Sequence, residues 1–373
     1  MIRLGKMGVV SSACVLVALR SASALACGGG GVTSSTGVTM GAQRVFMSVR
    51  NAGTTDIVAQ IVVPQTTASY GVLIPVPDEP TLDSEPVSAG DLTKLDQLTQ
   101  PVITRTESSG MSCGCGSGGD DDSADPGTNG SVTVSSQATI GPVKAVGLTA
   151  DSGDAVRAWL SENGFSLPQT DAATLNRYVG GGRYFIAIRR AEAGASGGPS
   201  SIGIHYTLPG DHRMLSLGFT RIGAGPNLGL TLFLAAPQTV GPSEPFKALT
   251  LDSLDAAILR RGDYPLAVQR AVAAQGSKAF VLENSAQGDN IATAVPGLAR
   301  FIDGGAIITR ATTVVAREQI SDDVVFATPF QGNVPSQRHV SLSGSSVRYA
   351  GMGLLPLVFI ARALRRRRPR ARH

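Results

Sequence analysis

An apolar run at residues 71–76 contains one proline and is followed by another, and it constrains the fold more than any other segment. Proline has no N–H to donate to a sheet ladder. A strand containing Pro75 is therefore expected at a sheet edge, or where the chain leaves the sheet at Pro77. A helix is predicted to begin near Ser88 and to end before Pro101. Its apolar face carries Leu92, Leu95 and Leu98.

Short apolar runs, several with strict alternation, recur along the rest of the chain and are typical of strands. The expected fold class is α+β, with predominantly antiparallel β-sheet and several short amphipathic helices. Predicted strands cover 43–50, 56–63, 71–76, 132–140, 143–148, 183–190, 201–208, 214–222, 228–235, 280–283, 306–315 and 324–330. Further helices are predicted from 153 and 170, and around 254–259, 263–275 and 294–302.

Residues 1–26 have the pattern of a secretory signal peptide. A positively charged start precedes an apolar stretch at 7–19, and the Ala-Leu-Ala triplet at 24–26 fits the cleavage rule. Cleavage after Ala26 leaves Cys27 as the first residue. Lipid attachment to Cys27 is the alternative, and a mature mass without acyl chains excludes it.

The formal charge of +4 conceals an acidic body. Eight arginines and no acid lie from Val347 onward; removing them gives −4, and removing the three cations of the leader gives −7. The body shows no basic patch, so nucleic acid is not expected as a partner.

Export makes a disulfide plausible among the three remaining cysteines, Cys27, Cys113 and Cys115. The simplest pairing joins Cys27 to one of the other two and leaves one thiol over. A redox or metal site at Cys113 and Cys115 is the alternative, but no histidine is near in sequence and zinc usually takes four ligands. No cofactor is expected.

The exported region is assigned to 27–340, as one unit or as two subdomains at about 27–150 and 151–340. A loop at 108–131, rich in Gly, Ser and Asp, is expected to be disordered. Trp159 is expected on the buried face of the helix that begins at 153, as a core residue rather than a platform for a ligand.

The C-terminal segment 341–373 is predicted to associate with a membrane. Its apolar run at 350–361 is shorter than the about 20 residues that a transmembrane helix needs. A membrane-spanning segment is therefore possible only if it begins as early as Ser341. In that arrangement the arginines stay on the cytoplasmic side of the membrane. The alternative is a basic end lying on anionic lipid. The residues assigned to this tail are Leu354, Leu355, Leu357, Val358, Phe359, Ile360, Arg365, Arg366, Arg367 and Arg368.

The sequence contains only weak matches to known catalytic motifs. The G-x-S-x-G pattern at 110–114 is followed by glycines and aspartates rather than by the helix that a nucleophile elbow requires. His205, His212 and Asp211 near predicted strand ends are the candidates for a remote acid–base or metal site. Histidines that have only a structural role are more common than histidines in catalytic or metal sites.

Seven short segments occur in a distinctive order: 26–29 (ACGG), 71–77 (GVLIPVP), 95–98 (LDQL), 158–164 (AWLSENG), 182–188 (GRYFIAI), 308–311 (ITRA) and 322–326 (DDVVF). Together, from about Ala26 to Phe330, they resemble the bacterial family known as domain of unknown function 2330. The resemblance implies an exported envelope protein and no particular reaction.

The leader, the tail and the weak catalytic motifs favour a non-catalytic envelope protein that binds, adheres or acts as a scaffold. An envelope protein or a polysaccharide is the expected partner. The alternative is an exported enzyme that uses the remote histidines and aspartate, or a thiol at Cys113 or Cys115.

Overall fold

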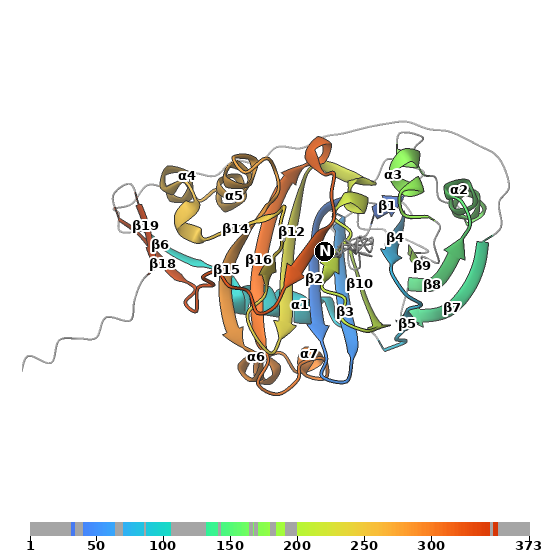
Figure 1. Cartoon of the computed structure of the whole chain (residues 1–373), viewed down its shortest axis with the longest axis horizontal. Helices are drawn as coiled ribbons and strands as arrows, with labels where there is room; N and C mark the ends of the chain where they lie inside the picture. The colour runs from blue at the N-terminus through green and yellow to red at the C-terminus, as the bar shows by residue number, and fades with distance from the viewer. Residues whose placement is uncertain are drawn as a thin grey trace, which may run out of the picture.

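The computed structural model describes residues 31–33, 40–63, 70–85, 87–105, 132–140, 143–163, 167, 171–179, 184–190, 200–343 and 346–349. Two sheets, one large and one small, lie side by side and share an apolar core, with short helices around them (Figure 1). The architecture confirms the α+β class, because strands dominate and most neighbouring strands run antiparallel.

The large sheet has eight strands in the order β14-β15-β16-β12-β2-β3-β10-β5. All pairs are antiparallel except β2 with β12 and β14 with β15. Its strands are β2 (Met40–Val49), β3 (Thr54–Val63), β5 (Thr81–Leu82), β10 (Ser200–Pro209), β12 (Ala224–Ala236), β14 (Lys247–Leu249), β15 (Ala279–Gln287) and β16 (Ile307–Ala316).

The small sheet is antiparallel, with the order β1-β4-β9-β8-β7. Its strands are β1 (Gly31–Thr33), β4 (Tyr70–Val76), β7 (Val132–Ile140), β8 (Val143–Ala150) and β9 (Tyr184–Arg190). Both sheets therefore combine strands from before and after residue 150.

Two three-stranded sheets complete the strand set. One has the order β11-β17-β13 and contains β11 (Met214–Leu215), β13 (Gly241–Pro242) and β17 (Val324–Ala327). The other lies at the far end of the molecule (Figure 1) and contains β6 (Val102–Arg105), β18 (His339–Ser343) and β19 (Ser346–Tyr349).

The helices are short and lie on the faces and ends of the sheets (Figure 1). They are α1 (Ala89–Thr99), α2 (Gly153–Glu162), α3 (Ala172–Asn176), α4 (Ala256–Arg260), α5 (Tyr264–Ala273), α6 (Gly288–Ala294) and α7 (Pro296–Ala299). Among the described residues, 3₁₀ turns accompany them at η2 (Gly218–Arg221), η3 (Leu251–Ser253) and η4 (Arg317–Gln319).

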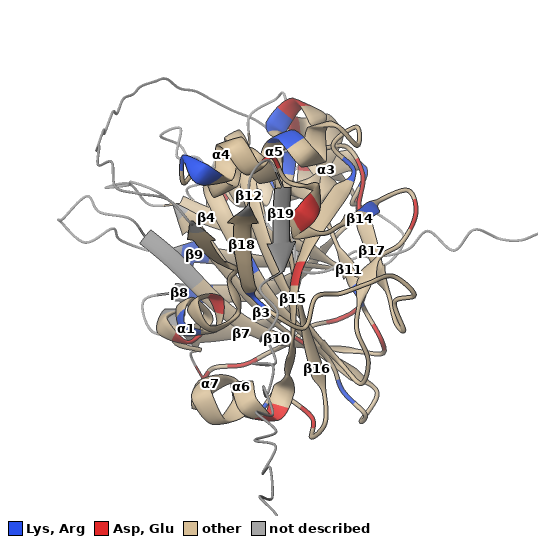
Figure 2. Ribbon diagram, turned by 90° about the vertical axis from the view of Figure 1, so that its left-hand side faces the viewer, with Lys and Arg blue, Asp and Glu red and all other residues tan. Residues whose placement is uncertain are grey.

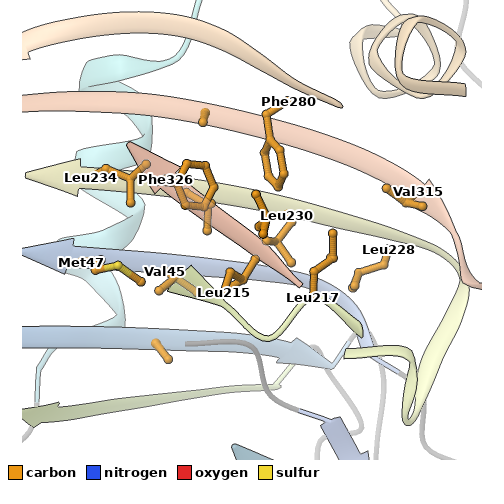
Figure 3. Close-up of a cluster of buried hydrophobic side chains, with 14 of the residues drawn as sticks. Val45, Met47, Leu215, Leu217, Leu228, Leu230, Leu234, Phe280, Val315 and Phe326 are labelled. Carbon is orange, nitrogen blue, oxygen red and sulfur yellow. The ribbon is translucent and has the colours of Figure 1, made fainter. Parts of the chain in front are cut away.

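The large sheet is apolar on both faces. Its inner face meets the small sheet and the β11–β17 segment in the main core, where Phe280 and Phe326 pack among branched side chains (Figure 3). Its outer face packs against α1, α6 and α7 through a second cluster that includes Phe46, Phe233 and Leu298. The small sheet uses its other face for a third cluster with α2 and α3.

The unit formed by the proline-containing strand and α1 is confirmed. The strand β1 pairs only with residues 71–73 of β4, so Pro75 has a described strand partner, β9, on one side alone. The Ser88 hydroxyl accepts a hydrogen bond from the N–H of Gly90 and caps α1. The helix ends at Thr99, as Pro101 requires.

One predicted strand is wrong. The segment 214–222 forms only the two-residue strand β11 and then the 3₁₀ turn η2. Its alternation of apolar and polar residues predicted a strand with one solvent-exposed face, but Ser216 and Thr220 are fully buried. The hydroxyl of Thr220 donates to the carbonyl of Leu217, a local hydrogen bond that competes with a sheet ladder.

At the C-terminal end, Ser341 and its neighbours belong to the hairpin β18–β19, so strand pairing continues to Tyr349. The apolar run that follows begins at Ala350. No helix in the described part of the chain is long and apolar enough to cross a membrane. In Figure 2, charged residues of both signs are scattered over the ribbon.

Candidate functional site

His205 lies at the centre of an ionic cluster on the outer face of the large sheet. Its Nδ1 lies 3.0 Å from Asp83 Oδ2, and its Nε2 lies 3.0 Å from Asp56 Oδ1. The imidazole stacks on Phe301, with ring centroids 4.2 Å apart. A neutral imidazole donates from one nitrogen only, so the doubly protonated ring is the form that satisfies both carboxylates.

Two arginines surround this His205 cluster. Arg50 bridges Asp56 and Asp303, with N–O distances of 3.1 and 2.8 Å. Arg300 pairs with Asp83 at 3.2 Å and lies over the ring of Phe301. The cluster therefore ties β3 and β10 to the turn after β2 and to the segment after α7.

The two aspartates of the cluster have lowered pKa values. Burial by itself raises the pKa of Asp56, but hydrogen bonds from His205 and Thr207 and the charges of His205 and Arg50 outweigh burial. For Asp83, burial is outweighed in the same way by hydrogen bonds from the Glu85 N–H and His205 and by the charges of His205 and Arg300. Both pKa values lie below the ordinary value of 3.8.

We expect this cluster to make folding acid-sensitive. Because the folded-state pKa values are lowered, the stabilisation is present at neutral pH and is lost as the pH falls below about 4 through the folded-state pKa. Urea unfolding at several pH values measures the slope. In Asp56→Asn the fall in unfolding free energy below pH 4 should be shallower than in the wild type. An unchanged slope would contradict the assignment.

His212 and Asp211 do not join the His205 cluster. The Nε2 of His212 lies 2.6 Å from the Pro209 carbonyl oxygen and 3.1 Å from a carboxylate oxygen of Asp78. Both carboxylate oxygens of Asp211 accept hydrogen bonds from Arg213. The structure therefore places the three predicted catalytic candidates in separate contacts.

A second ionic network links α1 to the large sheet. Arg310 on β16 pairs with Asp96 of α1 at 2.6 Å and with the fully buried Glu283 of β15. Glu283 sits at an irregularity of β15 and also accepts a hydrogen bond from Tyr264. Burial by itself lowers the pKa of Arg310, but the charges of Glu283 and Asp96 raise it overall. The network fixes α1 across β15 and β16.

A partly open groove of about 340 Å³ crosses the small sheet at the C-terminal end of α2. In Figure 1, α2 lies beside β8 and β7, at the end of the molecule away from the β6–β18–β19 sheet. Two cations, Lys144 and Arg189, line the groove together with Trp159 and the amides of Gln137 and Asn163. The remaining lining residues are Gly71, Val72, Val134, Val146, Leu160, Ala187 and Ile188.

Strand register explains how the groove acquires its charge. Lys144 of β8 lies directly opposite Arg189 of β9, and both side chains are exposed. On the far side of β9, Arg189 faces Gly71, which has no side chain to fill the space. The next row of the sheet contains the small or neutral residues Ala187, Val146 and Gln137. One end of the groove is therefore cationic, and the rest is lined by apolar residues and two neutral amides.

A family model for uncharacterized proteins conserved in bacteria, domain of unknown function 2330, matches residues 21–242, more than half of the chain. The chain belongs to this family. The groove of this member of the domain of unknown function 2330 family lies within the matched range. Two of the segments on which the resemblance was based, 308–311 and 322–326, lie beyond it.

The comparison with curated proteins found no match. Among solved structures, the chain is similar to the crystal structure of baculovirus P35, with 12% sequence identity and a TM-score of 0.23. The similarity covers 56% of this family member and 72% of the baculovirus chain.

Several predicted site residues of this domain of unknown function 2330 protein lie outside the described residues. These are the cleavage site at Ala26, the disulfide candidates Cys27, Cys113 and Cys115, the loop at 108–131, and the tail from Leu354 to Arg368.

The groove was not predicted from the sequence. Trp159 packs against the third apolar cluster, as predicted, but part of its surface also lines the groove. Lys144 and Arg189 are far apart in sequence and carry no motif. The available signal was that both lie on predicted strands, but only the pairing of β8 with β9 and its register make them neighbours.

Proposed function

We propose that the protein is an exported, non-catalytic envelope protein, tethered at its C-terminus, whose body binds a partner in the groove beside Trp159. The observation that carries this proposal is the contrast between two kinds of side chain. The candidate acid–base groups are enclosed by contacts within the fold, whereas Lys144, Gln137 and part of Trp159 are presented at the surface of the groove.

Binding fits this contrast better than catalysis does. Both ring nitrogens of His205 face carboxylates, so neither is available to take a proton from a substrate. Neither His205, His212 nor Asp211 lines the groove. The thiol version of the enzyme hypothesis rests on Cys113 and Cys115, and alanine variants at both positions that leave the phenotype intact would remove it.

The proposed location rests on the two ends of the sequence. The leader at 1–26 follows the secretory pattern, and the end of the chain combines an apolar run with an arginine cluster. Between them lies an acidic body, which belongs outside the inner membrane under this proposal.

Cell fractionation with protease accessibility tests the location. We expect a mature chain that begins at Cys27 and sediments with membranes at low salt. Protease added to spheroplasts should digest the body, which lies outside the inner membrane under this proposal. The quadruple change of Arg365–Arg368 to glutamine should release the chain from membranes, because the basic end is no longer attracted to anionic lipid. An intact leader on a soluble cytosolic species would overturn the proposal.

A further inference from the structure

We propose that β7, the outer strand of the small sheet, binds an extended segment of a partner protein as an additional antiparallel strand, and that one side chain of this segment enters the groove beside Trp159. This inference rests on the proposed binding function and names the class of partner. Its first support is position. The strand β7 ends the order β1-β4-β9-β8-β7 (Figure 1), and β8 is the only described strand that pairs with it.

The edge at β7 differs from every other sheet edge in the described part of the chain. Natural proteins limit unwanted pairing at an edge by keeping it short or by placing charges and prolines in it. The other edge strands, β1, β5, β6, β11, β13, β14 and β19, contain two to four residues each. The strand β7 contains nine residues, 132–140, and none of them is charged or proline.

The outer side of β7 is accessible to an incoming strand. Every second residue of an edge strand directs its N–H and C=O away from the sheet. In the described part of the chain, no backbone group outside β8 forms a hydrogen bond with the backbone of residues 132–140. Thr133, Gln137 and Thr139 are exposed, and Val134 is 50% exposed. An added strand would pair with the outward backbone groups and cover Val134.

The groove face of the sheet determines which side chains the partner needs. Alternate side chains of an added strand would lie beside Val134, Gln137 and Thr139 on this face. Val134 and Trp159 line the same groove, so the side chain opposite Val134 enters it and should be apolar. Lys144 is exposed and lies opposite Thr139, one strand further into the sheet. An acidic side chain on the other side of Thr139 is therefore complementary to Lys144 in charge.

The register of β7 fixes the spacing of these two side chains. On β8, the residues opposite Thr139 and Val134 are Lys144 and Leu148, which are four positions apart, because Ser135 has no partner in the ladder. An antiparallel strand on the other side of β7 meets the same irregularity. The expected partner segment therefore carries an acidic residue, an apolar residue four positions later, and uncharged residues that favour strands between them.

A second copy of the chain fits this edge less well than a partner segment does. The body without leader and tail has a formal charge of −7, so two copies repel each other. The strand β7 also contains no acidic residue that could lie beside Thr139 and pair with Lys144. Pairing of β7 with itself is therefore an outcome that the experiment must distinguish.

A synthetic strand tests the edge directly. The probe is the acetylated, amidated octapeptide Ser-Glu-Val-Thr-Val-Ile-Thr-Ser, titrated into the purified full-length chain. Trp159 is the only tryptophan in the chain and lines the groove, so its emission should change saturably. Two further peptides carry N-methyl groups on the odd or on the even positions. The set that points at β7 should weaken binding more than about tenfold, and the set that points away should change it little.

Variants of the protein test the side-chain contacts. Lys144→Glu should weaken binding of the probe by about tenfold and bind more tightly a probe in which lysine replaces glutamate, an exchange of preference that a purely structural residue would not produce. Val134→Lys should also weaken binding, because a charge on an edge strand opposes pairing. The matched control is Val325→Lys on β17, where the valine is 39% exposed, and it should bind as the wild type does.

Three results of the titrations would overturn the inference: no saturable response to the octapeptide, loss of binding by both N-methylated peptides or by neither, and an unchanged charge preference in Lys144→Glu. Sedimentation velocity of the chain alone adds a fourth. A dimer that Val134→Lys dissociates would show that β7 pairs with itself instead. The fractionation experiment is independent of these measurements, so a chain that lies at the envelope but does not bind the octapeptide would remove this inference and leave the proposed location standing.

Discussion

Replacing Arg310 with methionine is expected to lower the free energy of unfolding by about 3–5 kcal/mol, the usual cost of removing one partner from a buried ion pair. The reason is Glu283, which has no exposed side-chain surface and would keep only its hydrogen bond from Tyr264. The loss of stabilisation at Asp96 is smaller, because Asp96 also pairs with Arg44 at 3.2 Å. The lost stabilisation is therefore concentrated at β15.

Urea unfolding of Arg310→Met and of the matched variant Arg157→Met measures this effect. Arg157 also pairs with an aspartate, but its partner Asp154 is 74% exposed. The control should lose less than about 1 kcal/mol, as exposed pairs do. Adding Glu283→Met to Arg310→Met should cost less than the two single changes together, because the buried charge is then gone. A loss below about 1 kcal/mol for Arg310→Met would show that the network contributes little.

Phe280→Ala is the second change with a large expected effect, about 3–5 kcal/mol of unfolding free energy. The ring of Phe280 is fully buried between the large sheet and the β11–β17 segment (Figure 3). Its centroid lies 5.4 Å from that of Phe326 and 6.0 Å from that of Phe246. Alanine removes both aromatic contacts and leaves a cavity where three elements meet.

The control for Phe280→Ala is Val325→Ala on β17. Val325 is 39% exposed although its neighbour Phe326 is buried, so its truncation should change stability by no more than about 0.5 kcal/mol. Thermal and urea unfolding should agree on the order of the two variants. If Phe280→Ala lowers the free energy of unfolding no more than Val325→Ala does, the packing of the β11–β17 segment on Phe280 contributes little to stability.

These two residues mark different kinds of contact. Phe280 joins the large sheet to segments on its inner face, and Arg310 joins the same sheet to a helix on its outer face. The groove belongs to neither contact, since it lies on the small sheet beside α2. Variants at Lys144 and Val134 are therefore expected to report on binding without disturbing the main core.

Local signals in the sequence predicted most elements correctly. The hairpin β2–β3 follows from two apolar runs around a turn, and α1 follows from a serine cap, three leucines and a proline stop. The segment 214–222 was predicted incorrectly because alternation of apolar and polar residues indicates a strand only if one face of the segment is exposed to solvent. Here every residue except Arg221 is buried against other elements, so the alternation does not separate a buried face from an exposed one.

The candidate sites were much less predictable. His205 was singled out as a chemical group, but its partners, Asp56 on β3 and Asp83 just after β5, reach it only in the folded sheet. The pairing of Lys144 with Arg189 requires β8 and β9 to meet in one register, and a slip of one residue would turn one of them to the other face.

The sequence by itself determined the local elements, because caps, prolines and apolar periodicity act between residues a few positions apart. The tertiary structure alone decided which distant strands became neighbours, which charges were buried and where the groove opened. Those outcomes depend on the register of strands brought together by packing of the whole core, and no short stretch of the chain contains that information.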